Sequence, residues 1–200
     1  MATVRFLVVI LYATSTVLGI PTPIKDLTFP GEARNGVNVR IVGGEEATAH
    51  QFPYQVALYI TKRSEIVFCG GSLVSNNYVL TAAHCPIDGT SVDVILGAHD
   101  IKHNESSQIR QTSDHFVVHP GWNSDDLLND IALIRLAKPV DESDYVKIIK
   151  IATGKNSYAG NNGTVTGWGY TYDNQFSESD TLLYETSSIL SNDDCKAIDP

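Results

Sequence analysis

Short apolar runs separated by turn residues dominate the chain from Gln51 onward, and they predict β-strands. None has the length and periodicity of a convincing amphipathic helix. Each run is as long as an ordinary strand and is bounded by residues that favour turns. The predicted strands span residues 54–60, 68–74, 78–81, 91–96, 115–118 and 131–136, and a second group covers residues 163–169 and 181–190.

The segments between these runs have the chemistry of turns and loops, as in Ser75-Asn76-Asn77, Asp88-Gly89 and Pro120-Gly121. Short strands at regular spacing with such turns between them favour an all-β barrel or sandwich. Residues 141–154 carry a weaker pattern and are suited to connect a first β unit to a second one. The pattern therefore predicts an all-β fold in two parts.

The N-terminal residues have the organisation of a secretory signal peptide. Arg5 precedes an uncharged, mostly apolar run over residues 6–19, which ends in small residues before Ile20-Pro21. That run is too short to cross a bilayer comfortably. We therefore expect residues 1–19 to be a signal peptide and the protein to be secreted, into an environment where disulfides persist.

Residues 20–40 resemble a pro-segment. They contain three prolines, show no periodicity and end in Val39-Arg40, and Ile41-Val42-Gly43-Gly44 follows. A plain linker would have the same composition. Cleavage between Arg40 and Ile41 is the interpretation that the residues after the junction favour.

Composition narrows the class of partner. The chain has 200 residues, 42% of them hydrophobic and 18% charged, with a net charge of −9 and no basic run. These fractions are ordinary for a soluble globular protein of one or two domains. The acidic balance argues against nucleic acid or an anionic membrane as a partner.

The chain has three cysteines, which is an odd number for a secreted protein. Cys69 and Cys85 are close in sequence and are the natural disulfide pair. Cys195 is left over, which suggests either an intermolecular bond or a missing partner. We favour the missing partner.

Two residues stand out as candidates for acid–base chemistry. In Thr81-Ala82-Ala83-His84-Cys85, two small residues let the backbone pack behind the imidazole, and a well-held histidine suits proton transfer. The alternative is a structural histidine beside a disulfide. Asp130 opens the run 131–136, which is predicted to be a strand buried on both faces. A carboxylate there needs hydrogen-bond donors such as a histidine N–H, although a turn aspartate is the alternative.

Five segments together resemble the chymotrypsin family of secreted serine endopeptidases. They occur in the family's order, from Ile41 to the end of the chain: Arg40-Ile41-Val42-Gly43-Gly44, Phe68-Cys69-Gly70-Gly71-Ser72-Leu73, Thr81-Ala82-Ala83-His84-Cys85, Asn129-Asp130-Ile131-Ala132-Leu133 and Thr166-Gly167-Trp168-Gly169. Phe52-Pro53-Tyr54-Gln55-Val56 and Val94-Ile95-Leu96-Gly97-Ala98-His99 are most similar to arthropod digestive chymotrypsin- and collagenase-like proteases.

The resemblance implies a double antiparallel β-barrel and a set of roles. Residues 41–141 would form the first barrel, and residues 142–200 the interdomain linker and part of the second, within one peptidase domain. His84 would be the general base, Asp130 would hold its tautomer, and the Cys69–Cys85 disulfide would lie behind the histidine. A trypsin-like protease would activate the zymogen by cleaving after Arg40. The resemblance further implies protein or peptide substrates and a monomer.

One departure from the family limits these implications. The family's nucleophile lies in Gly-Asp-Ser-Gly-Gly, after His and Asp in chain order, and residues 1–200 contain no such motif. Ser187, Ser188 and Ser191 lack glycine-rich surroundings. We interpret the sequence as C-terminally truncated, with an incomplete second barrel, and as inactive by itself. The alternative is a non-catalytic protease homologue that acts as a binding or regulatory protein.

Weaker motifs concern modification and metals. Asn104 and Asn162 each begin an N-glycosylation sequon. His99 with His103, and His115 with His119, have a spacing that metal ligands use, but neither pair has a third ligand at clear spacing. Some family members bind calcium through a Glu at the position of Ala98. We therefore expect no metal and no cofactor.

Overall fold

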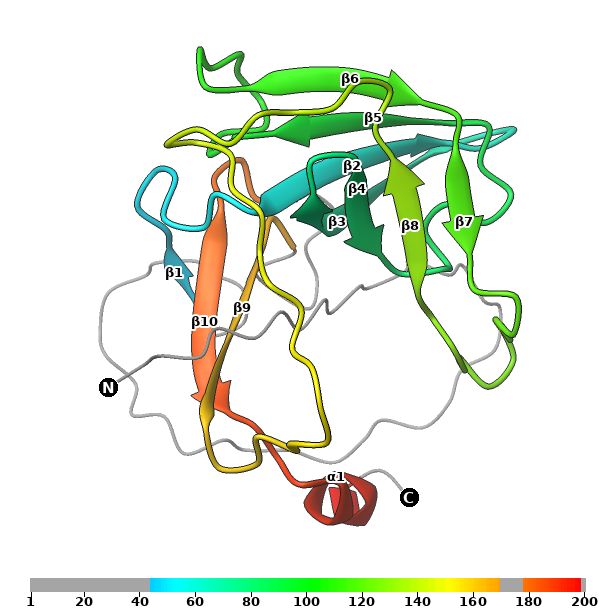
Figure 1. The fold of residues 1–200 in the computed structure, drawn as a ribbon, viewed down its shortest axis with the longest axis vertical. Helices are drawn as coiled ribbons and strands as arrows, with labels where there is room; N and C mark the ends of the chain where they lie inside the picture. The colour runs from blue at the N-terminus through cyan, green and yellow to red at the C-terminus, as the bar shows by residue number, and fades with distance from the viewer. Residues whose placement is uncertain (1–43, 170–177, 199–200) are drawn as a thin grey trace.

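The computed structural model describes residues 44–169 and 178–198, which form two antiparallel β-sheets (Figure 1). The larger sheet has seven strands in the order β6-β5-β2-β3-β4-β8-β7, and the smaller has three in the order β1-β10-β9. The expected signal peptide, the pro-segment and the Arg40–Ile41 junction lie outside the described residues. The strands of the larger sheet are β2 (Gln55–Thr61), β3 (Ile66–Ser75), β4 (Tyr78–Thr81), β5 (Ser91–Leu96), β6 (Ile109–Ser113), β7 (Phe116–Val118) and β8 (Ala132–Arg135). Those of the smaller sheet are β1 (Glu45–Glu46), β9 (Asn162–Gly167) and β10 (Leu183–Ser188).

Alternation along the central strands places a core on the inner face of the larger sheet. Because successive side chains of a strand point to opposite faces, every second residue of β2 points inward. Each of these residues faces an apolar partner of β5 across the antiparallel pair, and all of them are buried: Val56 opposite Leu96, Leu58 opposite Val94, and Ile60 opposite Val92. These cross-strand pairs fix the register of the two strands.

The outer face of the same strands packs against the smaller sheet. Ala57 of β2 and Ile95 of β5 are buried in a second cluster together with Trp168 and Leu182. The indole Nε1 of Trp168 donates a hydrogen bond to the carbonyl oxygen of His99 at 2.9 Å, and so ties the end of β9 to the residues after β5. β2 and the end of β5 therefore lie between two cores, whereas Asp93 on the outer face of β5 is exposed.

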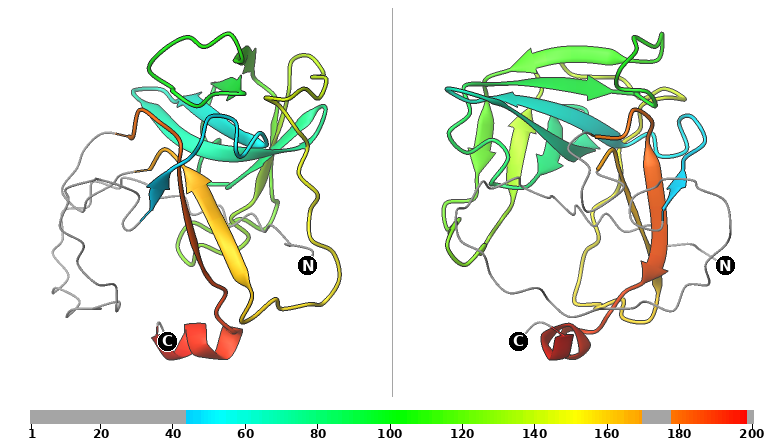
Figure 2. Two further views of the ribbon diagram at one scale, coloured as in Figure 1. Left: turned by 90° about the vertical axis from the view of Figure 1, so that its left-hand side faces the viewer. Right: turned by 180° about the vertical axis from the view of Figure 1, so that it is seen from behind.

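The larger sheet curls until its two ends approach each other (Figure 1). Ser113 at the end of β6 is buried, and its hydroxyl donates to the carbonyl oxygen of Arg135 in β8 at 2.6 Å. Two views show the smaller sheet projecting from this curled sheet, with the helix α1 (Asn192–Ile198) beyond the end of β10 (Figure 2). This arrangement is mostly β, with one short helix, and is consistent with the predicted double barrel.

The segment between the sheets contains neither helix nor strand over residues 136–161, and the expected connection 141–154 lies inside it. The helix α1 was not predicted. It has no buried residue, so it lacks the apolar stripe by which a helix is recognised in sequence. Among the described residues, no helix is long and apolar enough to span a bilayer.

Three further details differ from the sequence-based expectations. β6 was not predicted because Ile109 is its only apolar residue, and main-chain pairing with β5 holds it in place. The prediction that residues 131–136 are buried on both faces is wrong: Ile131 is 44% exposed and β8 alternates between buried and more exposed positions. Finally, β1 pairs with β10, so the start of the expected unit 41–141 contributes a strand to the smaller sheet.

Candidate active site

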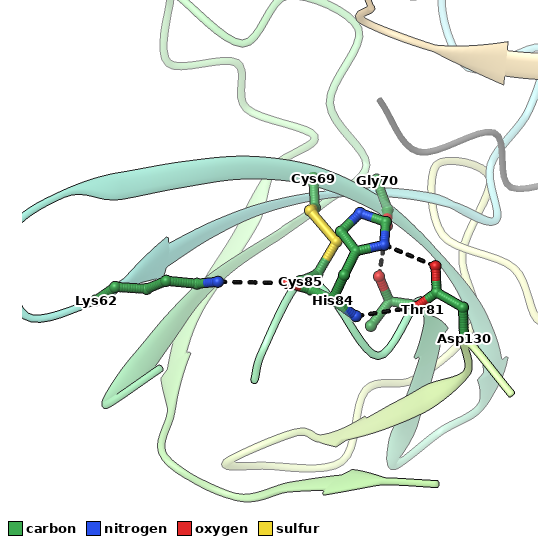
Figure 3. The surroundings of a disulfide bond; sticks show 7 residues. All are labelled: Lys62, Cys69, Gly70, Thr81, His84, Cys85 and Asp130. Atoms are coloured by element: carbon green, nitrogen blue, oxygen red, sulfur yellow. Dashed lines mark hydrogen bonds and ion pairs between the residues drawn. A yellow bond between two sulfur atoms is a disulfide. The ribbon is translucent and has the colours of Figure 1, made fainter. Parts of the chain in front are cut away.

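His84 lies on the turn that follows β4, and buried small residues hold the backbone of that turn. Ala82 and Ala83 are 5% and 0% exposed, and Ala82 belongs to the core of the larger sheet. The hydroxyl of Thr81, the last residue of β4, donates to the carbonyl oxygen of Gly70 in β3 at 2.8 Å. Strand and turn are therefore fixed to the neighbouring strand immediately before the imidazole (Figure 3).

A disulfide fixes the other side of the turn. Cys85 is bonded to Cys69 of β3, as expected, with the two Cα atoms 6.4 Å apart. The strands here pack closely, and a Cβ atom added to Gly71 would lie 2.6 Å from Cγ1 of Val79. Glycine at this position therefore leaves the space that the Val79 side chain occupies.

Asp130 lies two residues before β8 and accepts two hydrogen bonds from His84. Its Oδ2 is 2.7 Å from the imidazole Nδ1, and its Oδ1 accepts from the backbone N–H of His84 at 2.9 Å. The side chains of His84 and Asp130 are 16% and 26% exposed. Asn129 has a positive φ of 58°, a conformation that asparagine tolerates better than most residues. The chain thus turns directly before the carboxylate.

This geometry fixes the protonation pattern of the neutral imidazole. An ionised carboxylate only accepts hydrogen bonds, so the proton of neutral His84 is on Nδ1 and the lone pair is on Nε2. Nε2 is buried and has no hydrogen-bond partner among the described residues. A histidine in this state can take a proton at Nε2 while the carboxylate stabilises the imidazolium that results.

Lys62 also contacts the histidine, and sequence reasoning missed this contact. Lys62 follows β2, and its ammonium Nζ donates to the backbone carbonyl oxygen of His84 at 3.3 Å (Figure 3). This carbonyl belongs to the peptide bond between His84 and Cys85. The contact joins residues 22 positions apart, and no sequence motif around either residue predicts it.

A second group that sequence reasoning missed is Glu105, in the loop after β5. One oxygen of its carboxylate accepts from the backbone N–H groups of His99 and Asp100, at 2.7 and 3.0 Å, and from Nε2 of Gln108 at 3.1 Å. Burial raises the pKa of Glu105, but these hydrogen bonds outweigh burial and hold the pKa below its ordinary value. The carboxylate therefore organises the loop that also contacts Trp168.

The other residues singled out in the sequence lie apart from the His84–Asp130 pair. Asn104 and Asn162 are exposed, the first in a loop and the second at the start of β9. Cys195 is exposed on α1 and has no disulfide partner in the described part of the chain. The histidines with metal-like spacing have other partners: His99 contacts Glu46, His103 contacts Asp100, His115 contacts Asp114, and Nδ1 of His119 accepts from the backbone N–H of Gly121.

Comparison with known proteins gives consistent matches. The trypsin family profile matches residues 41–199. Brachyurin of Leptuca pugilator is 41% identical over 158 residues, which cover 79% of this chain and 68% of brachyurin. Chymotrypsin of Phaedon cochleariae is 32% identical, over 80% of this chain and 59% of that protein.

Comparison of the fold with solved structures also finds a similar protein. A solved structure described as "Structure of GrC" superposes with a TM-score of 0.74 at 32% identity, covering 80% of this chain and 70% of the other. These matches confirm the predicted chymotrypsin-like fold and the likeness to arthropod members. The chain belongs to the trypsin family of chymotrypsin-like serine proteases.

Proposed function

We propose that the protein is a serine-type endopeptidase in which His84 is the general base and Asp130 orients it. The observation that carries the proposal is the pair of hydrogen bonds from His84 to Asp130, at 2.7 and 2.9 Å. Together they determine which imidazole nitrogen has a lone pair. In the triad mechanism, Nε2 accepts the proton of a serine hydroxyl as that oxygen attacks the peptide carbonyl, and later passes the proton to the leaving amine.

The nucleophile is the part of this mechanism that residues 1–200 do not supply in the family's motif. The proposal therefore applies to a protein that carries Gly-Asp-Ser-Gly-Gly in addition to this sequence. Sequencing the transcript on the far side of the Pro200 codon tests this requirement. A different residue in place of that serine would favour the alternative, a non-catalytic homologue that binds or regulates other proteins.

We further propose that the enzyme is secreted and made as a zymogen. The sequence from Arg5 to Pro21 supports export, and cleavage between Arg40 and Ile41 by a trypsin-like protease would release the mature chain. The structural support is indirect: β1 pairs with β10 only a few residues after this junction.

Covalent labelling tests the enzyme function. The intact secreted protein is treated with trypsin and then with a fluorophosphonate probe, which reacts only with an activated serine. We expect labelling that depends on prior cleavage and that His84→Ala reduces by about 10²-fold or more, because the general base is lost. His115→Ala, at an exposed histidine away from the pair, is the matched control. Labelling unaffected by His84→Ala would contradict the proposal.

A further inference from the structure

We propose that reduction of the Cys69–Cys85 disulfide creates a binding site for a thiophilic divalent metal ion, Zn²⁺ or Cd²⁺. The ligands would be the two cysteine thiolates and the imidazole of His84. In the described residues, one ring nitrogen of His84 and the two sulfur atoms lie within 4.8 Å of one another. Cys₂His is a ligand set that zinc uses in proteins, with an open fourth position.

The geometry requires only a small rearrangement. Ligand atoms that share one tetrahedral zinc ion lie roughly 3.5–3.8 Å apart, because the metal–ligand bonds are about 2.0–2.3 Å long. In the oxidised protein the sulfur atoms are bonded to each other and cannot both bind a metal. Breaking that bond lets the sulfur atoms separate, while β3 and the turn after β4 keep the two residues in place. The site is therefore available only in the reduced protein.

The histidine is already arranged as a metal ligand would be. A histidine that binds a metal through one ring nitrogen usually donates its other N–H to a carboxylate, which orients the ring. Nδ1 of His84 makes this contact with Asp130 at 2.7 Å, and Nε2 is buried without a partner among the described residues. The nitrogen that is not bonded to Asp130 points away from that carboxylate (Figure 3).

The chemistry has two balanced steps. A small dithiol reductant supplies two electrons and two protons, so that the Cys69–Cys85 bond breaks into two thiols and the reductant closes into its own disulfide. The metal ion then binds both sulfur atoms, and their two protons pass to solvent. A metal on Nε2 would remove the general base, a consequence that rests on the proposed function. Binding itself does not depend on it.

The test titrates the full chain with Cd²⁺, whose bonds to thiolates absorb in the ultraviolet. All proteins carry Cys195→Ser, which removes the exposed thiol on α1, and each is measured oxidised and reduced without oxygen. We expect one Cd²⁺ per reduced chain, bound at least about tenfold more tightly than by the oxidised chain. Asp130→Asn should weaken binding by about 10–100-fold, as is typical when the carboxylate behind a metal-bound histidine is lost.

His84→Ala should weaken Cd²⁺ binding at least as much as Asp130→Asn, and His115→Ala should leave it unchanged. Far-UV circular dichroism confirms that each reduced protein keeps its β-sheet signal, and His84→Gln replaces His84→Ala if the alanine variant does not. The proposal is overturned if the reduced chain binds Cd²⁺ equally well without His84, binds none, or loses its sheet on reduction. Fluorophosphonate labelling, measured separately, distinguishes failure of the enzyme function from failure of the metal site.

Discussion

Replacing Asp130 with asparagine should reverse the tautomer of His84, and the geometry of the pair shows why. The two oxygens of Asp130 accept from two different groups of His84, Nδ1 and the backbone N–H. Asparagine has one oxygen and one NH₂ group, so it can accept only one of these hydrogen bonds. The backbone N–H of His84 can only donate, so it takes the amide oxygen of the asparagine as its acceptor. The NH₂ group of the asparagine then faces Nδ1 of His84.

Nδ1 must then accept, so the imidazole proton moves to Nε2. The nitrogen that should take a proton from the nucleophile now carries one of its own. General-base catalysis contributes about 10²–10⁴-fold to a rate, and we expect a loss in this range for kcat/KM of the activated intact protein. The loss should appear in kcat rather than KM, because the substituted group does not bind substrate.

Nitrogen-15 NMR of the full chain measures the tautomer directly and does not require catalysis. At a pH where the imidazole is neutral, the wild-type protein should have the proton of His84 on Nδ1 and the Asp130→Asn variant should have it on Nε2. His115→Ala is the control for assignment. An Nδ1 proton in the variant would refute the argument, because it would mean that the backbone N–H does not determine the amide orientation.

Three further outcomes follow from contacts near the site. Lys62→Met should lower stability by about 1 kcal/mol at most, since one long hydrogen bond is lost, without changing the His84 tautomer; a changed tautomer would contradict this. Replacing both Cys69 and Cys85 with alanine should cost about 3 kcal/mol in urea unfolding through loop closure, and a loss below about 1 kcal/mol would show that the disulfide constrains little. Because Glu105 has a lowered pKa when folded, its contribution to stability is present above its ordinary value of 4.5 and disappears as the pH falls through the folded pKa. The melting temperature of Glu105→Gln should therefore fall less than that of the wild type between about pH 5 and pH 3, and equal falls would contradict the assignment.

The strands that the sequence predicts best are those that face a core. β4 and β5 have the predicted bounds, 78–81 and 91–96, because their apolar residues alternate or cluster against buried neighbours. β6 lacks this signal, since its side chains other than Ile109 are polar. Such a strand forms because the neighbouring strand offers backbone hydrogen-bonding groups. The residues of β6 give no sign of this pairing in their own pattern.

The missed helix had a readable signal at its start. Ser191 accepts from the backbone N–H of Asp194 at 3.1 Å and donates to its carboxylate at 2.6 Å. A serine followed three residues later by an acidic residue is the sequence signature of a helix N-terminus. Without an apolar stripe behind it, that signature alone did not predict α1.

The residues of the candidate site fall into the same two groups. Some are indicated by their neighbours in sequence, and others are brought to the site only by the fold. The local sequence makes His84 and Asp130 candidates, beside a disulfide turn in one case and a β-strand in the other, and the resemblance to the chymotrypsin family assigns their roles. Lys62 and Glu105 bind backbone groups of other segments. Every residue carries such backbone groups, so the sequence does not show which of them a side chain will contact. Residues that bind carbonyls and amides of distant segments are therefore the ones that a structure adds to a sequence-based site.

Trp168 illustrates how one such contact links the two sheets to the site. Its side chain is 1% exposed, packs in the cluster between the sheets and donates to the carbonyl of His99, whose backbone N–H in turn donates to Glu105. The Thr166-Gly167-Trp168-Gly169 segment is therefore a structural requirement rather than a chemical one. β2 and β5 contribute side chains both to the Trp168 cluster and to the core that contains Ala82 and Cys85 of the His84 turn, so the same two strands support the contact between the sheets and the turn that carries the histidine.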